Sequence, residues 1–236
     1  PAGSIGINSG ALYTNSPAVT LNLSATDASS GIGTMSFSTN NVNWTAVEAY
    51  AASKNLMLPS GDGVKTVYVR YYDKAGNFSA TLSKSITLDT TVPAGSINIS
   101  SGALYTNSTA VTLDLLATDS GSGISAMSFS ADGTNWTTPV AYATSKMFTL
   151  TEGDGVKQVY VKYYDKAGNA SVVYSKSIIL DTLPPTGTIK INGGVQYITQ
   201  SAATMDLSAT DAGSGLSKMS FSTNGTTWTT AENYAA

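Results

Sequence analysis

The chain of 236 residues contains no cysteine and no histidine. Without cysteine it can form neither a disulfide nor a thiolate zinc site, and without histidine it lacks the commonest general base and metal-binding side chain. Charged residues make up only 11% of the chain, and 12 basic against 15 acidic residues leave a net charge of −3. Because there is no basic stripe, we expect no nucleic acid and no anionic lipid as a partner.

Long apolar runs are also absent. No stretch approaches the ~18 consecutive apolar residues that a membrane-spanning helix needs, so we expect no membrane insertion in this segment. The chain nevertheless contains 42% hydrophobic residues, spaced regularly among Ser, Thr, Asn, Gly and Ala. This is enough apolar material for ordinary cores, and the abundance of Thr, Val and Tyr favours strands joined by polar turns.

One segment recurs along the chain. PAGSIGINSGALYTN begins at Pro1, PAGSINISSGALYTN at Pro93 and PTGTIKINGGVQYIT at Pro185, which gives a period of 92 residues. YYDKAGN at Tyr71 recurs in the same register at Tyr163. This period exceeds the ~20–50 residues of solenoid repeats and suits an autonomous β-sandwich. The predicted units are repeat 1 over residues 1–92, repeat 2 over 93–184 and an incomplete repeat 3 over 185–236.

Alternating apolar and polar residues predict seven short strands within one unit. Val19, Leu21 and Leu23 alternate with polar residues, and turns such as Gly-Asp-Gly and Ala-Gly-Asn separate the runs. No segment of helical length shows helical periodicity. The predicted fold class is therefore all-β, with tandem seven-stranded Ig-like β-sandwiches at a 92-residue period. The expected strands of repeat 1 lie at 4–7, 19–23, 34–38, near Trp44, at 56–58, 64–73 and 79–88.

The order of the motifs resembles that of a known family. LSATD-x-x-SGI from Leu23, FS-x(5)-W from Phe37, GDG-x-K-x-VYV-x-YYDKAGN from Gly61 and LDT-x-x-P from Leu88 are similar to bacterial Ig-like (immunoglobulin/fibronectin-type-III-like) repeats. Such repeats occur in tandem in large secreted or surface-anchored proteins. The resemblance covers repeats 1 and 2 and repeat 3 up to its end. It implies a sandwich fold, an extracellular or cell-surface location, and a spacer or adhesive role.

Acidic residues recur in loops that a sandwich brings to one end of the unit. Because strands alternate in direction, the loops after the second and sixth strands lie at the N-terminal pole, where the preceding linker adds another carboxylate. Carboxylate and amide oxygens meeting there would suit a hard cation such as Ca²⁺, which would stiffen the junction. The alternative is that each Asp only caps its own turn. The candidate metal ligands are Asp27, Asp73, Asp89, Asp119, Asp165, Asn169, Asp181 and Asp211.

One tryptophan per repeat follows an Asn- or Gly-rich turn. These residues are Trp44, Trp136 and Trp228, and they are the candidate binding residues because exposed tryptophan can stack on a sugar ring. The alternative is that each fills the sandwich or covers its edge, as a single tryptophan per sandwich commonly does.

No catalytic constellation is visible, so we do not expect an enzyme. There is no Gly-x-Ser-x-Gly elbow and no phosphate loop, and the carboxylates recur in every copy at turn positions. The predicted function is a structural stalk, spacer or filament segment of an extracellular surface protein, with other copies of the repeat as partners. A module binding surface glycans or a protein partner, or a noncatalytic appendage of a secreted hydrolase, remains an alternative.

Repeat 3 ends before the equivalents of the two longest strands, which leaves half of its expected core uncovered. Two explanations are open. Either the chain is a segment of a longer one, or strands of a neighbouring chain complete the unit.

Overall fold

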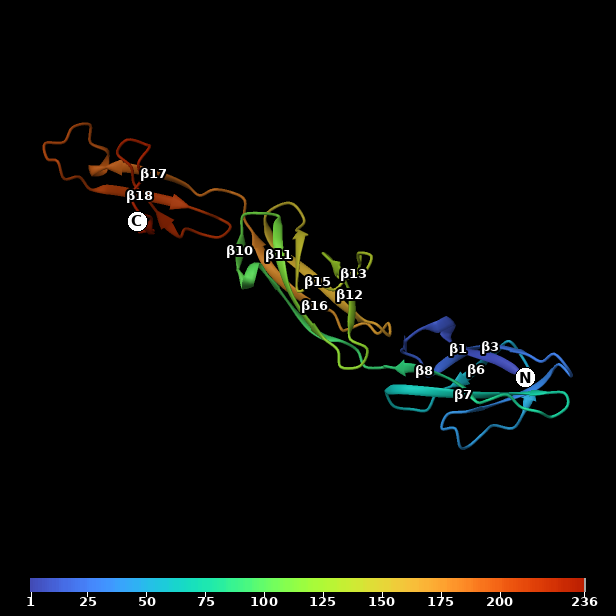
Figure 1. The fold of residues 1–236 in the computed structure, drawn as a ribbon. Coiled ribbons are helices and arrows are strands. Elements are labelled where there is room, and N and C mark those ends of the chain that lie inside the picture. Colours follow the sequence, from blue (N-terminus) through green and yellow to red (C-terminus); the bar gives the residue numbers. More distant parts are fainter. Residues whose placement is uncertain (236) are drawn as a thin grey trace.

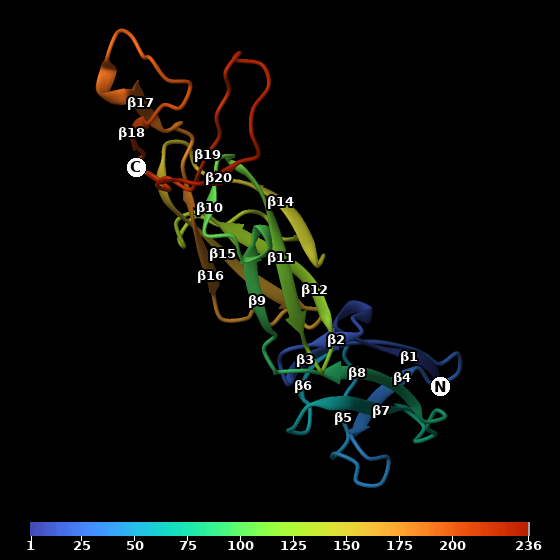
Figure 2. The ribbon, with the colours of Figure 1, turned by 90° about the vertical axis from the view of Figure 1, so that its left-hand side faces the viewer.

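The computed structural model describes residues 1–235, and the segments follow one another in a row with the two termini at opposite ends (Figure 1). Figure 2 shows the same succession after a quarter turn. The all-β prediction is confirmed: the described residues form strands, and their helical elements are three-residue 3-10 turns, η1 (Asn8–Gly10), η2 (Ser100–Gly102) and η3 (Asn192–Gly194). No helix within residues 1–235 has the length and hydrophobicity needed to cross a membrane.

Repeat 1 is a sandwich of two sheets. One has three strands in the order β1-β3-β6, and the other has five in the order β2-β8-β7-β4-β5. All pairs are antiparallel except that of β2 with β8, which is parallel. The strands are β1 (Ala2–Ile7), β2 (Tyr13–Thr14), β3 (Ala18–Thr26), β4 (Ile32–Ser38), β5 (Glu48–Ala49), β6 (Ser53–Met57), β7 (Gly63–Asp73) and β8 (Leu82–Leu88).

Repeat 2 has the same architecture, with sheets in the orders β14-β11-β9 and β10-β16-β15-β12-β13. Its strands are β9 (Ala94–Ile99), β10 (Tyr105–Thr106), β11 (Ala110–Thr118), β12 (Ile124–Ser130), β13 (Val140–Ala141), β14 (Ser145–Thr149), β15 (Gly155–Asp165) and β16 (Tyr174–Leu180). In repeat 1 the β3–β4 and β7–β8 loops therefore lie at the same pole of the sandwich. In repeat 2 the same holds for the β11–β12 and β15–β16 loops.

The core lies between the two sheets and follows the alternation of the long strands. In β7, Val67, Val69 and Tyr71 are buried, whereas the residues between them face outward. The Tyr71 hydroxyl donates a hydrogen bond to the main-chain oxygen of Ser4 at 2.6 Å and so ties β7 to the opposite sheet. Burial raises the pKa of Tyr71 to about 12. A side chain at Gly3 would overlap the Tyr71 ring, which explains the glycine there.

Besides small shifts of strand ends, such as β6 at Ser53–Met57 instead of 56–58, the strands differ from the sequence prediction in three places. No strand forms at Trp44; instead, the backbone and hydroxyl of Thr45 bond both main-chain groups of Phe37, and the short β5 follows. The last strand begins at Leu82 rather than 79, because Ser79 uses its side chain and main chain to bond Tyr71 before regular pairing starts. The two-residue β2 was not predicted, and with it each complete sandwich has eight strands rather than seven.

Repeat 3 contains β17 (Thr186–Ile191), β18 (Met205–Thr210), β19 (Lys218–Met219) and β20 (Glu232–Asn233). Within residues 185–235 nothing corresponds to β15 and β16. The side chain of Ile99 in repeat 2 is 0% exposed, whereas its equivalent Ile191 is 51% exposed. The uncovered face is a hollow of about 1000 Å³ whose lining includes Met205, Leu207 and Phe221.

Candidate functional site: the carboxylates at the repeat junction

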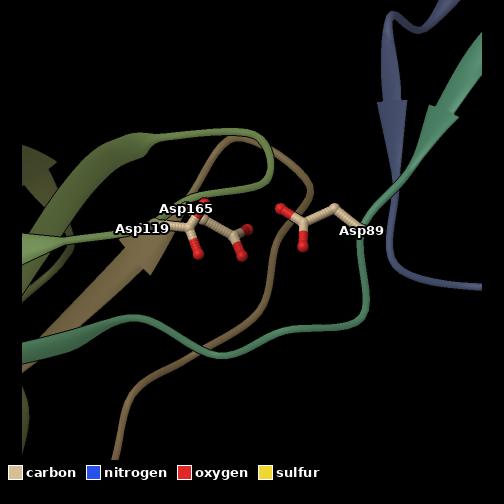
Figure 3. A group of neighbouring side chains, drawn as sticks. All are labelled: Asp89, Asp119 and Asp165. Carbon is tan, nitrogen blue, oxygen red and sulfur yellow. The ribbon is translucent and has the colours of Figure 1, made fainter. Parts of the chain in front are cut away.

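Three carboxylates meet where repeat 1 joins repeat 2. Asp89 follows β8 in the linker, Asp119 lies in the loop after β11, and Asp165 ends β15. One oxygen from each lies within 4.8 Å of the other two, and Figure 3 shows the three side chains pointing toward one another. The sandwich topology brings them together, because it places both loops of repeat 2 at the pole where the linker enters.

Asp89 is the linker's contribution and is 0% exposed. Its Oδ2 accepts a hydrogen bond from the main-chain N–H of Ser122 at 2.6 Å, and its Oδ1 accepts one from Thr91 at 3.2 Å. Its main-chain oxygen accepts a hydrogen bond from the Asn169 side chain at 2.8 Å. The linker is therefore bound to both loops of repeat 2. The sequence prediction missed Ser122, whose contribution is a main-chain N–H that no residue type signals.

Asp119 and Asp165 each use one oxygen to hold their own loop. Oδ1 of Asp119 accepts hydrogen bonds from the main-chain N–H groups of Gly121 and Gly123, at 3.1 and 2.8 Å. Oδ1 of Asp165 does the same for Gly168 and Asn169, at 2.7 and 2.8 Å. Turn capping, the alternative reading of these residues, is therefore present. These main-chain hydrogen bonds use only one oxygen of each carboxylate.

The second oxygens have different surroundings. Oδ2 of Asp165, a residue only 2% exposed, accepts a hydrogen bond from the Asn169 side chain at 2.7 Å. Oδ2 of Asp119 exposes less than 1 Å² and has no hydrogen-bond partner among the described residues. Asn169 was expected to offer an oxygen, but in this structure its amide nitrogen faces Asp165 and the linker, so it orients the carboxylates.

Gly121 makes room for the linker carboxylate. A Cβ atom at this position would overlap the side chain of Asp89. Its φ is not in the left-handed region, so the requirement for glycine is one of space. The equivalent residue of repeat 1 is Ser29.

None of the three carboxylates forms an ion pair with a lysine or arginine within residues 1–235. The ion pairs found in residues 1–235 join the amino group of Pro1 to Asp27 and Lys54 to Glu48. Nζ of Lys166 lies beside Gly123, in the loop of Asp119, and 6.0 Å from the ring centre of Tyr13 in repeat 1. Since a buried carboxylate without a compensating charge is unfavourable, the site is electrostatically suited to a bound cation or proton.

The other end of the linker is fixed to repeat 1 by Asp62. Its Oδ1 accepts hydrogen bonds from the N–H and the hydroxyl of Thr90, at 3.0 and 2.9 Å, and its Oδ2 accepts one from the hydroxyl of Thr91 at 2.9 Å. The side-chain hydrogen bonds from Thr90 and Thr91 hold the pKa of Asp62 below its ordinary value. The linker is therefore held from both sides.

The second junction repeats this arrangement with fewer carboxylates. Asp181 is 8% exposed, and its Oδ2 accepts a hydrogen bond from the N–H of Ser214 at 2.6 Å. Hydrogen bonds from Ser214 lower the pKa of Asp181. Asp211 caps its loop through the N–H groups of Gly213 and Gly215. In the described part of the chain, only the first junction gathers three acidic residues close enough to share one ion.

In repeat 1 the corresponding residues are Asp27 and Asp73. Oδ1 of Asp27 accepts main-chain hydrogen bonds from its loop, and the bond from Ser30 is the main cause of its lowered pKa. Its Oδ2 lies 3.3 Å from the positively charged amino group of Pro1. A hydrogen bond from the side chain of Asn77 lowers the pKa of Asp73. The side chain of Asn169 donates the corresponding hydrogen bond to Asp165 in repeat 2.

Trp44 and Trp136 lie on the outer side of the five-stranded sheets of repeats 1 and 2 rather than in the cores. The guanidinium carbon of Arg70 is 4.1 Å from the ring centre of Trp44, and Nζ of Lys162 is 4.2 Å from that of Trp136. A cation therefore covers one face of each ring. Trp228 in repeat 3 is 59% exposed. Sugar stacking on these three rings stays a prediction.

The fold and the junction define a class: Ig-like β-sandwiches joined end to end by short, hydrogen-bonded linkers. A family model described as "Bacterial Ig-like domain" matches residues 7–90 and 111–182, together more than half of the chain. The chain belongs to the bacterial Ig-like domain family, as its motifs predicted. Ig-like domains of this kind are generally noncatalytic modules. The comparison with curated protein sequences gave no match.

Solved structures with a related fold include the fibronectin(III)-like modules of CbhA from Clostridium thermocellum, at 15% identity and a TM-score of 0.49, covering 75% of this chain and 93% of that one. The D00-D0 domain of intimin is 16% identical, with a TM-score of 0.34 and coverage of 76% and 100%. The human OSCAR ligand-binding domain is 13% identical, with a TM-score of 0.35 and coverage of 76% and 98%. At these values the similarity carries no inference about function.

Proposed function

We propose that the chain is a structural spacer of an extracellular surface protein, whose reach grows with the number of repeats. The observation that carries this proposal is the linker at the first junction. It is bound to repeat 1 through Asp62 and to repeat 2 through Ser122 and Asn169, so neither end is free to swing. A binding module on a flexible tether would not need a linker fixed at both ends.

The dimensions of the repeat suit this role. The longest strand, β7, has 11 residues, and at ~3.3 Å per residue a repeat with its linker extends the chain by about 40 Å. The termini of the described chain lie at opposite ends, so added repeats would lengthen the molecule without thickening it (Figure 1). Proline follows each linker, at Pro93 and at Pro184–Pro185, and limits the bending that a glycine-rich linker would allow.

Solution X-ray scattering tests the mechanical part of the proposal. We expect the full chain to have the maximum dimension and cross-section of a straight rod. We expect Asp62→Ala combined with Ser122→Pro, which removes the main-chain N–H that binds Asp89, to give the broader distance distribution of a flexible string. Ser30→Pro, at the equivalent loop position of repeat 1, is the matched control because the linker between repeats 1 and 2 binds Ser122 and not this loop. A wild-type chain as flexible as the double variant would contradict the spacer role.

The location is tested separately. We expect an antibody against repeats 1 and 2 to label intact cells that carry the gene, and external protease to remove the label. Labelling only after the cells are broken open would contradict a surface location, whatever the stiffness of the chain.

A further inference from the structure

We propose that the first junction is a divalent-cation site, formed by Asp89, Asp119 and Asp165, that takes Ca²⁺. The three carboxylates come from the linker and from two separate loops of repeat 2, so an ion bound to all of them would join the linker to the domain that follows. Such an ion would deepen the proposed function by making the stiffness of the spacer depend on the surrounding calcium concentration. Its biological meaning therefore rests on that function, although its existence does not.

The burial of charge is the first argument. Asp89 and Asp165 are 0% and 2% exposed, and their ligand oxygens and that of Asp119 lie within 4.8 Å of one another. None of the three carboxylates takes part in either ion pair found in residues 1–235. Like charges at this distance repel, and burial weakens the screening that water would supply. A divalent cation removes the repulsion at all three positions at once.

The second argument is Oδ2 of Asp119, which is buried and has no hydrogen-bond partner within residues 1–235. Its companion Oδ1 is occupied by Gly121 and Gly123, so Oδ2 is the oxygen that the loop leaves available. A buried acceptor without a partner is rare in a stable fold and calls for an explanation.

The donor set favours calcium among the common divalent ions. The site offers only oxygens, and histidine and cysteine, which would attract zinc, are absent from the chain. Calcium accepts irregular geometries at about 2.3–2.6 Å, so two of its ligands on opposite sides lie about 4.6–5.2 Å apart. Oxygens spread over distances up to 4.8 Å fit within that span. Magnesium demands a tighter and more regular octahedron, and water would complete the calcium shell.

The substitution Asp119→Asn tests the proposed ligand specifically. An asparagine keeps the Oδ1 acceptor for Gly121 and Gly123 but replaces the unpartnered oxygen by an amide, so the loop stays capped while the proposed ligand is lost. Asp27→Asn is the matched control, because it makes the same change at the equivalent loop of repeat 1. In a chelator, we expect Asp119→Asn to melt at the wild-type temperature or slightly above it, since one like charge has been removed.

The full chain, stripped with EGTA, is titrated calorimetrically with CaCl₂ and separately with MgCl₂ at pH 7.4. We expect one saturable calcium site that raises the melting temperature, an affinity lower by roughly tenfold or more in Asp119→Asn, and an unchanged affinity in Asp27→Asn. No calcium binding, equal losses in both variants, or binding of magnesium in preference to calcium would overturn the proposal.

X-ray scattering of the same samples separates this outcome from that of the spacer function. A rod-like chain that binds no calcium would refute only the cation site. A chain that binds calcium but stays flexible would refute only the spacer function.

Discussion

The N-terminal poles of repeats 1 and 2 have nearly the same sequence but different chemistry. In repeat 1, Asp27 and Asp73 hold their own loops, and Ser29 in the first of these loops is exposed. In repeat 2, the linker inserts Asp89 between the two loops, and Gly121 replaces the serine. In repeat 2 the turn-capping residues thus become part of a buried cluster of three carboxylates, because the linker from repeat 1 supplies the third.

Among the substitutions that would remove the difference between the two poles, we expect Gly121→Ala to have the largest effect. Its Cβ would overlap the Asp89 carboxylate, so the linker must leave its position and the Ser122 N–H loses its acceptor. Loss of a buried hydrogen bond to a charged group costs about 1.5–3 kcal/mol. We expect Ser122 to lose its protection in amide hydrogen exchange and X-ray scattering to show a flexible chain. Ser29→Ala, at the equivalent position of repeat 1, should change neither; similar effects of the two substitutions would contradict the assigned role of Gly121.

A smaller effect is expected where the linker is held by the preceding repeat. Asp62 accepts three hydrogen bonds from Thr90 and Thr91, whereas Asp154 accepts two from Thr182, because Leu183 stands where the second threonine would be. We therefore expect Asp62→Ala to reduce amide protection at the first linker more than Asp154→Ala reduces it at the second. Equal reductions would show that the extra hydroxyl contributes nothing.

Lowering the pH should weaken the loop of repeat 1 that Asp27 holds, which tests the comparison from the side of repeat 1. Hydrogen bonds from the loop lower the pKa of Asp27 below 3.8 in the folded protein. The stability that this group contributes is thus complete above pH 3.8 and is lost as the pH falls through the lowered folded value. We expect the amide protection of Ser30 to decrease below about pH 4. In Asp27→Asn the side chain does not titrate, so its part of this decrease should be absent; an unchanged acid response would assign the effect to other groups.

The smallest effect is expected at the outer faces of the two sandwiches. Arg70 lies over Trp44 in repeat 1, and Lys162 lies over Trp136 in repeat 2. Because a guanidinium stacks on an aromatic ring better than an ammonium, Arg70→Lys should destabilise repeat 1 by up to about 1 kcal/mol in chemical denaturation. Lys162→Arg should leave repeat 2 unchanged or slightly more stable. A change of opposite sign in either repeat would show that the stacking does not stabilise the fold.

Much of the fold could be predicted from the sequence, because it depends on local patterns that recur. The alternation of Val67, Val69 and Tyr71 identified the inner face of β7, and the turn residues separated it from its neighbours. The missed strand β2 has two residues and is held by parallel pairing to β8, more than 70 residues away in the sequence. So short a strand has no periodicity of its own to detect.

The candidate site was predictable in part. The expected direction of the strands placed Asp89, Asp119 and Asp165 at one pole, and the structure brings their oxygens close together. The roles of Ser122 and Gly121 could not be predicted, since one acts through its main chain and the other through the absence of a side chain. The orientation of the Asn169 amide also depends on partners from separate loops.

The sequence by itself determined that the chain is an array of β-sandwiches of one kind, because strand formation follows from the alternation of apolar and polar residues over a few positions. It also determined which oxygen-bearing side chains lie in the loops. Only the tertiary structure decided that one linker carboxylate becomes buried between two loops and that one oxygen of Asp119 is left without a partner. Burial and hydrogen bonding depend on contacts between segments 30 to 80 residues apart, which no local pattern encodes.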